Sequence, residues 1–109
     1  MNESDLNLYE MKAELCKTFS DARRLIIISE LCQGERTVGE LTRAINVAQA
    51  SVSRHLAVLR EHRLVKTRRE GTRIHYSLSE PMLSEACQIV HQLVLNQMET
   101  ARKLAERLT

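Results

Sequence analysis

The sequence predicts a mainly α-helical fold that carries one β-hairpin after its central helices. Apolar residues recur every three or four positions over most of the 109-residue chain, which is the period of an α-helix. Residues 73–78 instead alternate between polar and apolar side chains, which is the period of a strand. Hydrophobic residues make up 43% of the chain and no Pro- or Gly-rich linker divides it, so we expect a single domain over residues 1–109.

Two helices are expected in the first third of the chain. The helical spacing of Leu8 and Leu15 predicts the first helix over about residues 5–18. Asp21 is a good N-cap for a second helix that continues to Gly34. Because this second helix is apolar on nearly every side, we expect it at the centre of the core.

A pair of short helices follows. Thr37 and Glu40 have the spacing of a capping box, which opens the third helix. Asn46 tolerates a left-handed backbone and therefore suits a tight turn into a fourth helix over about residues 49–62. The inward stripe of the fourth helix consists of Val52, Leu56 and Leu59.

A hairpin is expected over about residues 64–78. The alternating strand 73–78 can pair with residues 65–69, and Gly71 supplies the unusual backbone angle at the tip. Pro81 then begins a last helix over about residues 81–107, which is roughly 40 Å long at 1.5 Å per residue. Because that length exceeds the width of a small domain, its apolar stripe needs a second surface. We therefore expect a homodimer formed by helices 5–18 and 81–107.

The net charge of +2 conceals an uneven distribution. Residues 42–78 hold eight Lys or Arg and only two acidic residues, whereas the rest of the chain is net acidic. A basic centre indicates a surface that binds a polyanion. Two short helices over 37–62 followed by a basic hairpin form the winged helix-turn-helix arrangement, in which the second short helix enters the major groove of double-stranded DNA.

The outward side of the fourth helix is small and polar, as insertion into a groove requires. Gln49, Ser51 and Arg54 can reach base edges or phosphates, and Arg54 can grip guanine with two hydrogen bonds. Ser53 and His55 flank them and are predicted to reach phosphates. The hairpin presents basic residues to the DNA backbone, namely Lys66, Arg68, Arg69 and Arg73. His62 and His75 are expected to be plain surface residues.

Four segments of the chain, LCKTFSDARRL (15–25), GERTVGEL (34–41), VAQASVSRHLAVL (47–59) and RREGTRIHYSL (68–78), resemble the ArsR/SmtB family of winged-helix repressors. The resemblance implies a homodimeric, sequence-specific repressor that binds an inverted-repeat operator and leaves it when an effector binds. It implies DNA contacts by Gln49, Ser51, Ser53, Arg54, His55, Arg68, Arg69, Thr72 and Arg73. One departure is Ala48, where the family usually has a Ser that caps the fourth helix.

The sensor sites of the family are missing from this sequence. Thr37 and Gly39 stand where the arsenic/cadmium site has its thiolates. The zinc site on the last helix reads Glu80, Met82, Leu93 and Asn96, and a redox thiol pair reads Ser29 and Leu95. We therefore expect no metal ion and no cofactor, and the effector is left open.

Cys16, Cys32 and Cys87 are odd in number and widely spaced, which argues against a disulfide framework. Each is interpreted first as a small buried hydrophobe. The alternative is a sensor in which two or three of these thiols converge at the dimer interface to bind a soft metal or metalloid ion or to be oxidised.

Two other function classes were weighed against DNA binding. A winged helix that binds protein predicts an apolar outward face on the fourth helix, whereas this face is small and polar. An enzyme is not expected, because the chain has no nucleophile–base arrangement and no Gly-rich phosphate loop. No apolar run approaches the roughly 18 residues that cross a bilayer, and no signal-peptide pattern opens the chain, so we expect a cytoplasmic protein without a membrane partner.

Overall fold

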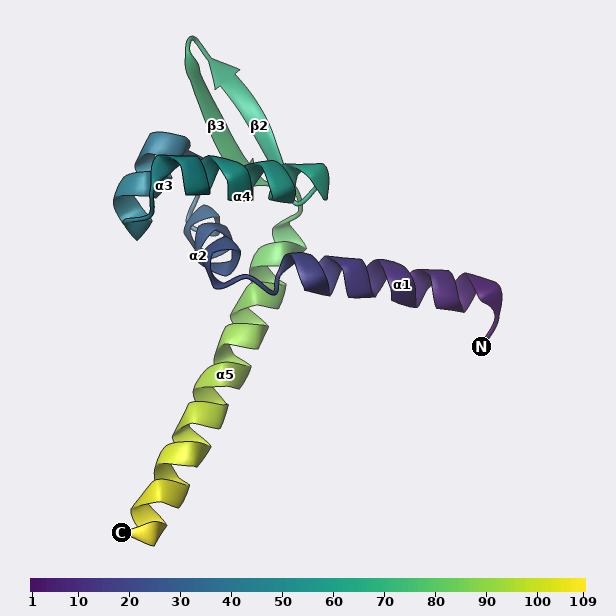
Figure 1. Ribbon diagram of the computed structural model, residues 1–109, viewed down its shortest axis with the longest axis vertical. Helices are drawn as coiled ribbons and strands as arrows, with labels where there is room; N and C mark the ends of the chain where they lie inside the picture. The colour runs from purple at the N-terminus through teal and green to yellow at the C-terminus, as the bar shows by residue number, and fades with distance from the viewer.

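The computed structural model describes residues 1–109 and contains five helices and three strands. Their bounds are α1 Glu3–Thr18, α2 Ala22–Leu31, β1 Arg36–Thr37, α3 Val38–Ile45, α4 Gln49–Glu61, β2 Val65–Glu70, β3 Arg73–Leu78 and α5 Pro81–Leu108. In Figure 1, α2, α3 and α4 form a central head from which the β2–β3 hairpin projects on one side. On the other side α1 and α5 extend away from the head in different directions, and the two termini lie at their far ends.

The helix starts follow the local side-chain chemistry. The Asp21 carboxylate accepts hydrogen bonds from the amides of Arg23 at 2.9 Å and Arg24 at 3.3 Å, which confirms it as the N-cap of α2. Thr37 and Glu40 form the predicted capping box at the start of α3. A second capping box, between Asn2 and Asp5, begins α1 two residues earlier than the sequence predicted.

The turn between α3 and α4 has the predicted left-handed residue. Asn46 has φ 53° and ψ 47°, and its amide donates to the Thr42 carbonyl at 3.0 Å. Asn46 thus ends α3, and α4 begins three residues later at Gln49. Ala48 occupies the N-cap position of α4 with no side-chain hydrogen bond, as its methyl group dictates.

The sheet has three strands in the order β1–β3–β2, with both pairings antiparallel. The prediction of only two strands was wrong, because β1 has two residues and is too short to show an alternating pattern. The hairpin register pairs Glu70 with Arg73, so the turn has two residues, Gly71 and Thr72. Gly71 has φ 61°, and a positive φ at the first turn residue is what this kind of tight hairpin needs.

The core is small and centred on α2 and α4. Its nine buried hydrophobic residues are Ile27, Ile28, Leu31, Leu41, Val52, Leu56, Leu59, Val65 and Leu83. The expectation that α2 lies at the centre of the core is confirmed, since Ile27, Ile28 and Leu31 are buried there, but its other apolar side is not covered. Leu25 and Ile26 are 44% and 45% exposed, because one side of α2 faces the core and nothing in the chain covers the other.

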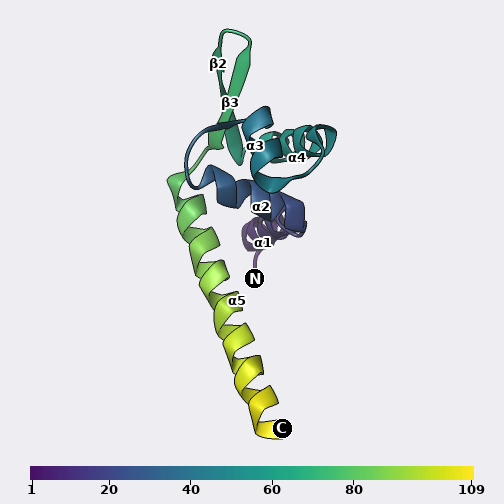
Figure 2. The ribbon, with the colours of Figure 1, turned by 90° about the vertical axis from the view of Figure 1, so that its left-hand side faces the viewer.

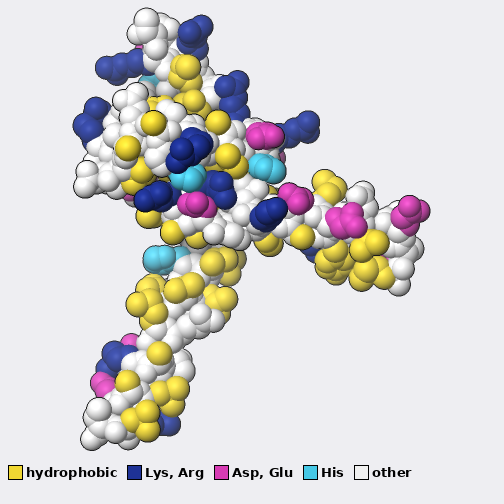
Figure 3. All heavy atoms as spheres, in the orientation of Figure 1, with side chains coloured by type: hydrophobic (Ala, Val, Ile, Leu, Met, Phe, Trp, Pro, Cys, Tyr) yellow, Lys and Arg dark blue, Asp and Glu magenta, His cyan; other side chains and the backbone are white.

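The two terminal helices contribute little to this core. Thr18 is the only buried residue of α1, and Leu83 is the only one of α5. Figure 2 shows α5 running far beyond the head, and Figure 3 shows hydrophobic side chains along the exposed lengths of α1 and α5. The exposed large hydrophobics of these helices include Leu6, Leu8, Tyr9, Met11, Leu15, Ile89, Val90, Leu93, Val94, Leu95, Met98 and Leu104. None of the helices combines the length and the hydrophobicity that crossing a bilayer requires.

The uncapped start of α4 yields a stability prediction. Ala48→Ser places a hydroxyl at an N-cap position whose backbone is already extended in ψ, at 138°. We expect the free energy of unfolding to rise by about 1 kcal/mol, since a Ser side chain accepts a hydrogen bond from the first turn of the helix. Urea unfolding at a fixed protein concentration measures the change.

The matched control for this prediction is Ala57→Ser, at an exposed position inside the same helix. A serine there gains no capping hydrogen bond and has a lower helix propensity than alanine, so stability should fall by a few tenths of a kcal/mol. Equal effects of the two substitutions would contradict the capping explanation.

Candidate nucleic-acid interface

The orientation of α4 is fixed by its buried side. Val52, Leu56 and Leu59 are all 0% exposed. The opposite side of the helix is exposed and carries the small or polar residues Gln49, Ala50, Ser53, Arg54 and Ala57. A helix with short side chains around one arginine can approach the floor of a major groove closely, because nothing bulky keeps it out.

His55 does not lie on this exposed side, and its predicted contact with DNA stays a prediction. The residue is only 7% exposed. It stands three residues after Val52 and four before Leu59, which is the spacing of the buried stripe itself. Hydrogen bonds from the backbone amides of Arg24 and Arg23 lower the pKa of the Asp21 carboxyl.

Ser51 is also less accessible than the sequence suggested. Its Oγ atom is buried and has no hydrogen-bond partner. The residue as a whole is half-buried, between the inward and the outward sides of α4. Among the predicted contact residues of α4, Gln49, Ser53 and Arg54 are therefore the exposed ones.

Three of the four predicted DNA contacts of the hairpin are exposed and unpaired, and the exception is Arg68. Arg69, Thr72 and Arg73 are exposed, and neither arginine takes part in an ion pair. Figure 3 shows dark blue Lys and Arg side chains on the projecting hairpin and over the head, with few on the part of α1 and α5 that is hydrophobic. The basic charge thus gathers on the side of the molecule away from the apolar helices.

Arg68 behaves differently from its neighbour Arg69. Its guanidinium holds the Glu35 carboxylate through two hydrogen bonds, Nη2 to Oε1 at 2.7 Å and Nε to Oε2 at 3.2 Å. Its Nη1 also donates to Glu70 at 3.0 Å. These carboxylates raise the pKa of Arg68 even further above its usual range, and the Arg68 hydrogen bond lowers the pKa of Glu35. Arg68 therefore ties the hairpin to the segment that leads into β1.

His75 completes this charge cluster and is not the plain surface residue that the sequence suggested. Its side chain is only 15% exposed, and its ring nitrogens lie 3.7 Å from Glu35 and 3.6 Å from Glu70. The β2–β3 register places His75 directly opposite Arg68, so both side chains project from one face of the hairpin. Glu35 reaches the same face from the loop before β1.

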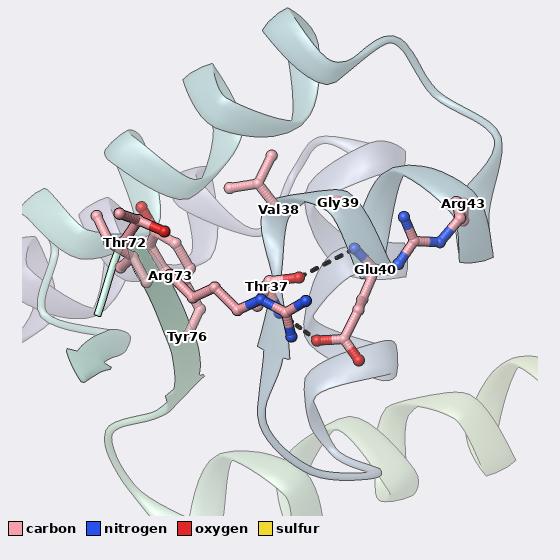
Figure 4. Close-up of a pocket in the computed structure, with 9 residues that line it drawn as sticks. Thr37, Val38, Gly39, Glu40, Arg43, Thr72, Arg73 and Tyr76 are labelled. Atoms are coloured by element: carbon pink, nitrogen blue, oxygen red, sulfur yellow. Dashed lines mark hydrogen bonds between the residues drawn. The ribbon is translucent and has the colours of Figure 1, made fainter. Parts of the chain in front are cut away.

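A cleft of about 520 Å³ lies between the hairpin and the first turn of α3. The residues that line it are Thr37, Val38, Gly39, Glu40, Arg43, Thr72, Arg73, Ile74 and Tyr76. Figure 4 shows Arg73 reaching from β3 toward Thr37 and Glu40, with Arg43 farther along α3. Sequence reasoning assigned no role to Arg43, although its charge belongs to the basic segment.

The three cysteines do not gather in one place within the chain. Cys16 is exposed on α1, which contradicts its interpretation as a buried hydrophobe in the single chain, whereas Cys32 and Cys87 pack against the core. Burial raises the pKa of the Cys87 thiol, and the neighbouring Cys32 raises it further, which disfavours the reactive thiolate. No group of three His, Cys, Asp or Glu side chains is arranged to hold a metal ion.

Comparison with known proteins agrees with this geometry. The family described as "bacterial regulatory protein, arsR family" matches residues 21–67, which span α2, α3, α4 and the start of the hairpin. The transcriptional activator HlyU of Vibrio cholerae is 35% identical over 94 residues, which cover 81% of this chain and 87% of HlyU. The chain belongs to the ArsR family. As a member it is a DNA-binding transcriptional regulator.

Two further relatives of this ArsR-family chain bear on its fold and activity. The biofilm growth-associated repressor of Xylella fastidiosa is 42% identical over 81 residues, covering 74% of this chain and 68% of that protein. A homodimeric winged helix-turn-helix DNA-binding domain from Mycobacterium bovis has a TM-score of 0.82 at 28% identity, covering 92% of this chain and 93% of that domain. The ArsR-family regulator described here therefore has the winged helix-turn-helix fold, with α3 and α4 as the helix pair and β2–β3 as the wing.

The Glu35–Arg68 pair yields a prediction about the pKa of the Glu35 carboxyl. Arg68→Gln should bring the pKa of the Glu35 carboxyl back up toward its ordinary value, since Arg68 is the first cause of the lowered value. Because the Glu35 pKa is lowered by folding, the pair stabilises the fold above the ordinary carboxyl pKa, and this contribution is lost as the pH falls through the lowered value. Carboxyl NMR titration of Glu35 in both proteins measures the shift.

Arg69→Gln is the control for this titration, because it removes the adjacent charge without touching the hydrogen bonds to Glu35. Glu35 should titrate in it nearly as in the unaltered protein. If Glu35 titrates identically in the Arg68→Gln and Arg69→Gln proteins, Arg68 does not hold Glu35 in solution.

Proposed function

We propose that this ArsR-family regulator is a homodimeric repressor that binds an inverted-repeat operator through α4 and the wing, and leaves it when an effector binds. The observation that carries the proposal is the division of α4 into a fully buried apolar side and an exposed side of small and polar residues. The relatives include a repressor and a transcriptional activator, and the proposal of repression follows the first of these. The protein acts in the cytoplasm, where promoter DNA lies, and catalyses no reaction.

The proposed DNA contacts divide between bases and phosphates. Arg54 is the base reader, since its exposed guanidinium can donate two hydrogen bonds to guanine in the major groove. Gln49 and Ser53 lie on the same exposed side of α4 and assist it. Arg69 and Arg73 contact the phosphate backbone from the wing, and Thr72 lies beside them at the tip.

Arg68 has a positioning role in this proposal rather than a phosphate contact. Its hydrogen bonds to Glu35 and Glu70 occupy three of its donor nitrogens. The Glu35 contact links the wing to the strand that precedes α3. We infer that this link keeps the wing at a constant distance from the helix pair, which suits it to follow the DNA backbone while α4 reads the groove.

The homodimer is supported by the apolar surface of the terminal helices. Only 11 of the 109 residues are buried in the single chain, and the exposed hydrophobic residues concentrate on α1, α2 and α5. A contiguous apolar surface of this kind is normally covered in a soluble protein. The Mycobacterium bovis domain, which has a TM-score of 0.82 to this chain, is a homodimer.

Sensing through the cysteines is still a prediction. Cys16 lies on α1, one of the two proposed dimer helices, whereas Cys32 and Cys87 pack against the core. Replacing each cysteine by Ser and repeating DNA binding with metal ions and with peroxide tests it. Full response in all three variants would exclude a thiol sensor.

The proposed function is tested by fluorescence anisotropy on the promoter DNA upstream of the gene for this chain. The expected result is saturable binding to an inverted repeat that is at least 1,000-fold tighter than binding to unrelated duplex, as specific regulators show. Metal ions, oxidants and sulfide are then added to find the effector. Equal affinity for both duplexes would contradict sequence-specific recognition.

Two arginine variants separate base reading from phosphate binding. Arg54→Ala should weaken operator binding by about 1–3 kcal/mol and relax the preference at one base position in each half-site. Arg69→Ala should weaken operator and unrelated DNA about equally and make the salt dependence of binding shallower. Anisotropy titrations on operator variants at several salt concentrations distinguish the two patterns, and the same pattern in both variants would contradict the assignment.

The dimer interface is tested by Val94→Asp on α5. Val94 is 46% exposed in the single chain, so a carboxylate there leaves the monomer fold intact, but it would be buried in the dimer. We expect analytical ultracentrifugation to show a monomer that binds DNA poorly. Gln88→Asp, which adds the same charge on the polar side of α5, should stay dimeric, and a dimeric Val94→Asp protein would refute the interface.

A further inference from the structure

The cleft between the wing and α3 is a candidate for a further DNA contact, which extends the proposed contact of Arg73 to α3. It follows from the short length of β1. This strand covers the outer edge of β3 only at Tyr76 and His75. From Ile74 to Thr72 that edge is free, and the cleft lies along it, closed on the far side by the first turn of α3.

Two arginines from different elements line this cleft. Arg43 projects from α3 and Arg73 from β3, and neither forms an ion pair. The only acidic group in the lining is Glu40, whose Oε1 accepts a hydrogen bond from the Thr37 amide at 3.0 Å. That hydrogen bond lowers the pKa of Glu40, so the carboxylate is charged, and the lining carries a net charge of +1. Glu40 is held at the helix start, which leaves both arginines available.

The first turn of α3 is open on the cleft side because residue 39 is glycine. A Cβ added to Gly39 would meet the Arg43 Nη1 at 3.5 Å and the Thr37 Oγ1 at 3.9 Å, so polar groups surround the place where a side chain would stand. Figure 4 shows Arg73 reaching from the wing toward Thr37 and Glu40, which belong to the same helix start. The cleft therefore offers arginine donors from both α3 and β3 along its lining.

We propose that this cleft binds the sugar-phosphate backbone of the DNA, with Arg43 and Arg73 as the phosphate ligands. The proposal rests on the proposed function and adds Arg43 to its contact surface. We expect DNA as the occupant because the cleft lies between two elements that approach the duplex, the wing and α3. In a helix-turn-helix the first helix, here α3, crosses the DNA backbone. Arginine and the N-terminal turns of helices are the usual partners of DNA phosphates.

Arg43→Gln tests the charge of the cleft with a fluorescein-labelled 30-base-pair duplex of mixed sequence. Loss of one phosphate contact per subunit should make the slope of log affinity against log salt concentration shallower by about 1.8 for a dimer. Arg107→Gln removes the same charge at the end of α5 and should leave the slope unchanged. An unchanged slope in Arg43→Gln would overturn the proposal.

Gly39→Asp and Gly39→Ala form a second, independent pair of variants. Aspartate in the first turn of a helix favours the helix, so Gly39→Asp should keep or raise the Tm while its carboxylate repels phosphate from the cleft. Gly39→Ala meets only ordinary contacts and should bind DNA as the unaltered protein does. Equal DNA affinity of the two variants would overturn the proposal.

The two proposals fail in different ways. If the unaltered protein binds no duplex at any salt concentration, the proposed function is wrong and the cleft contact is wrong with it. If it binds DNA and loses base preference in Arg54→Ala, but Arg43→Gln and Gly39→Asp bind normally, the regulator stands and only the cleft contact is refuted.

Discussion

The burial of one side of α4 is the constraint on which the rest of the molecule depends. Val52, Leu56 and Leu59 have no exposed surface, and each contacts the same small core as α2 and α3. Rotation of α4 about its axis would expose these side chains to water, at a cost of about 1.5–3 kcal/mol for each. The opposite side of the helix is therefore held outward in one orientation. Arg54 is therefore exposed because Val52, Leu56 and Leu59 are buried on the opposite side of the helix.

The base of the wing is held by Val65 in the core, and a cluster of charged side chains links the wing to the loop before β1. A two-stranded hairpin that projects from a domain has few apolar contacts of its own. Here the Arg68 guanidinium binds Glu35 and Glu70, and His75 lies against the same two carboxylates. This cluster occupies one face of the hairpin, and it leaves Arg69 and Arg73 unpaired. Arg68 thus forms ion pairs within the protein, whereas Arg69 and Arg73 are available to contact DNA.

The size of the core explains the shape of the molecule. Nine buried hydrophobic residues hold together the head and the base of the wing, but they do not include α1 or most of α5. Those helices expose apolar side chains along their length and extend the molecule to 58 Å. A second copy that covers this surface would complete the hydrophobic burial and fix the separation of two reading helices. In such a dimer, the burial of the apolar surface of α1 and α5 would both stabilise the protein and set the distance between the two half-sites of the operator.

Much of the fold was determined by the sequence alone, because its signals are local. The caps at Asp21 and Thr37, the left-handed Asn46 and the turn at Gly71 depend on hydrogen bonds and backbone angles within a few residues. Helical and strand periodicity supplied the remaining elements except β1, which has too few residues to show a period. The exposed residues of α4 followed from the same periodicity, and Arg54 was identified in this way.

Only the tertiary structure decided how individual polar side chains are used. Sequence reasoning treated His55 and Arg68 as DNA contacts, because both are polar and lie near the reading surface. The fold buries His55 and pairs Arg68 with Glu35, a partner 33 residues away in the chain. It also brings Arg43 and Arg73 to one cleft from separate elements. Periodicity shows which side of an element a residue occupies, but its partners come from segments distant in the chain, and their positions exist only once the core has formed.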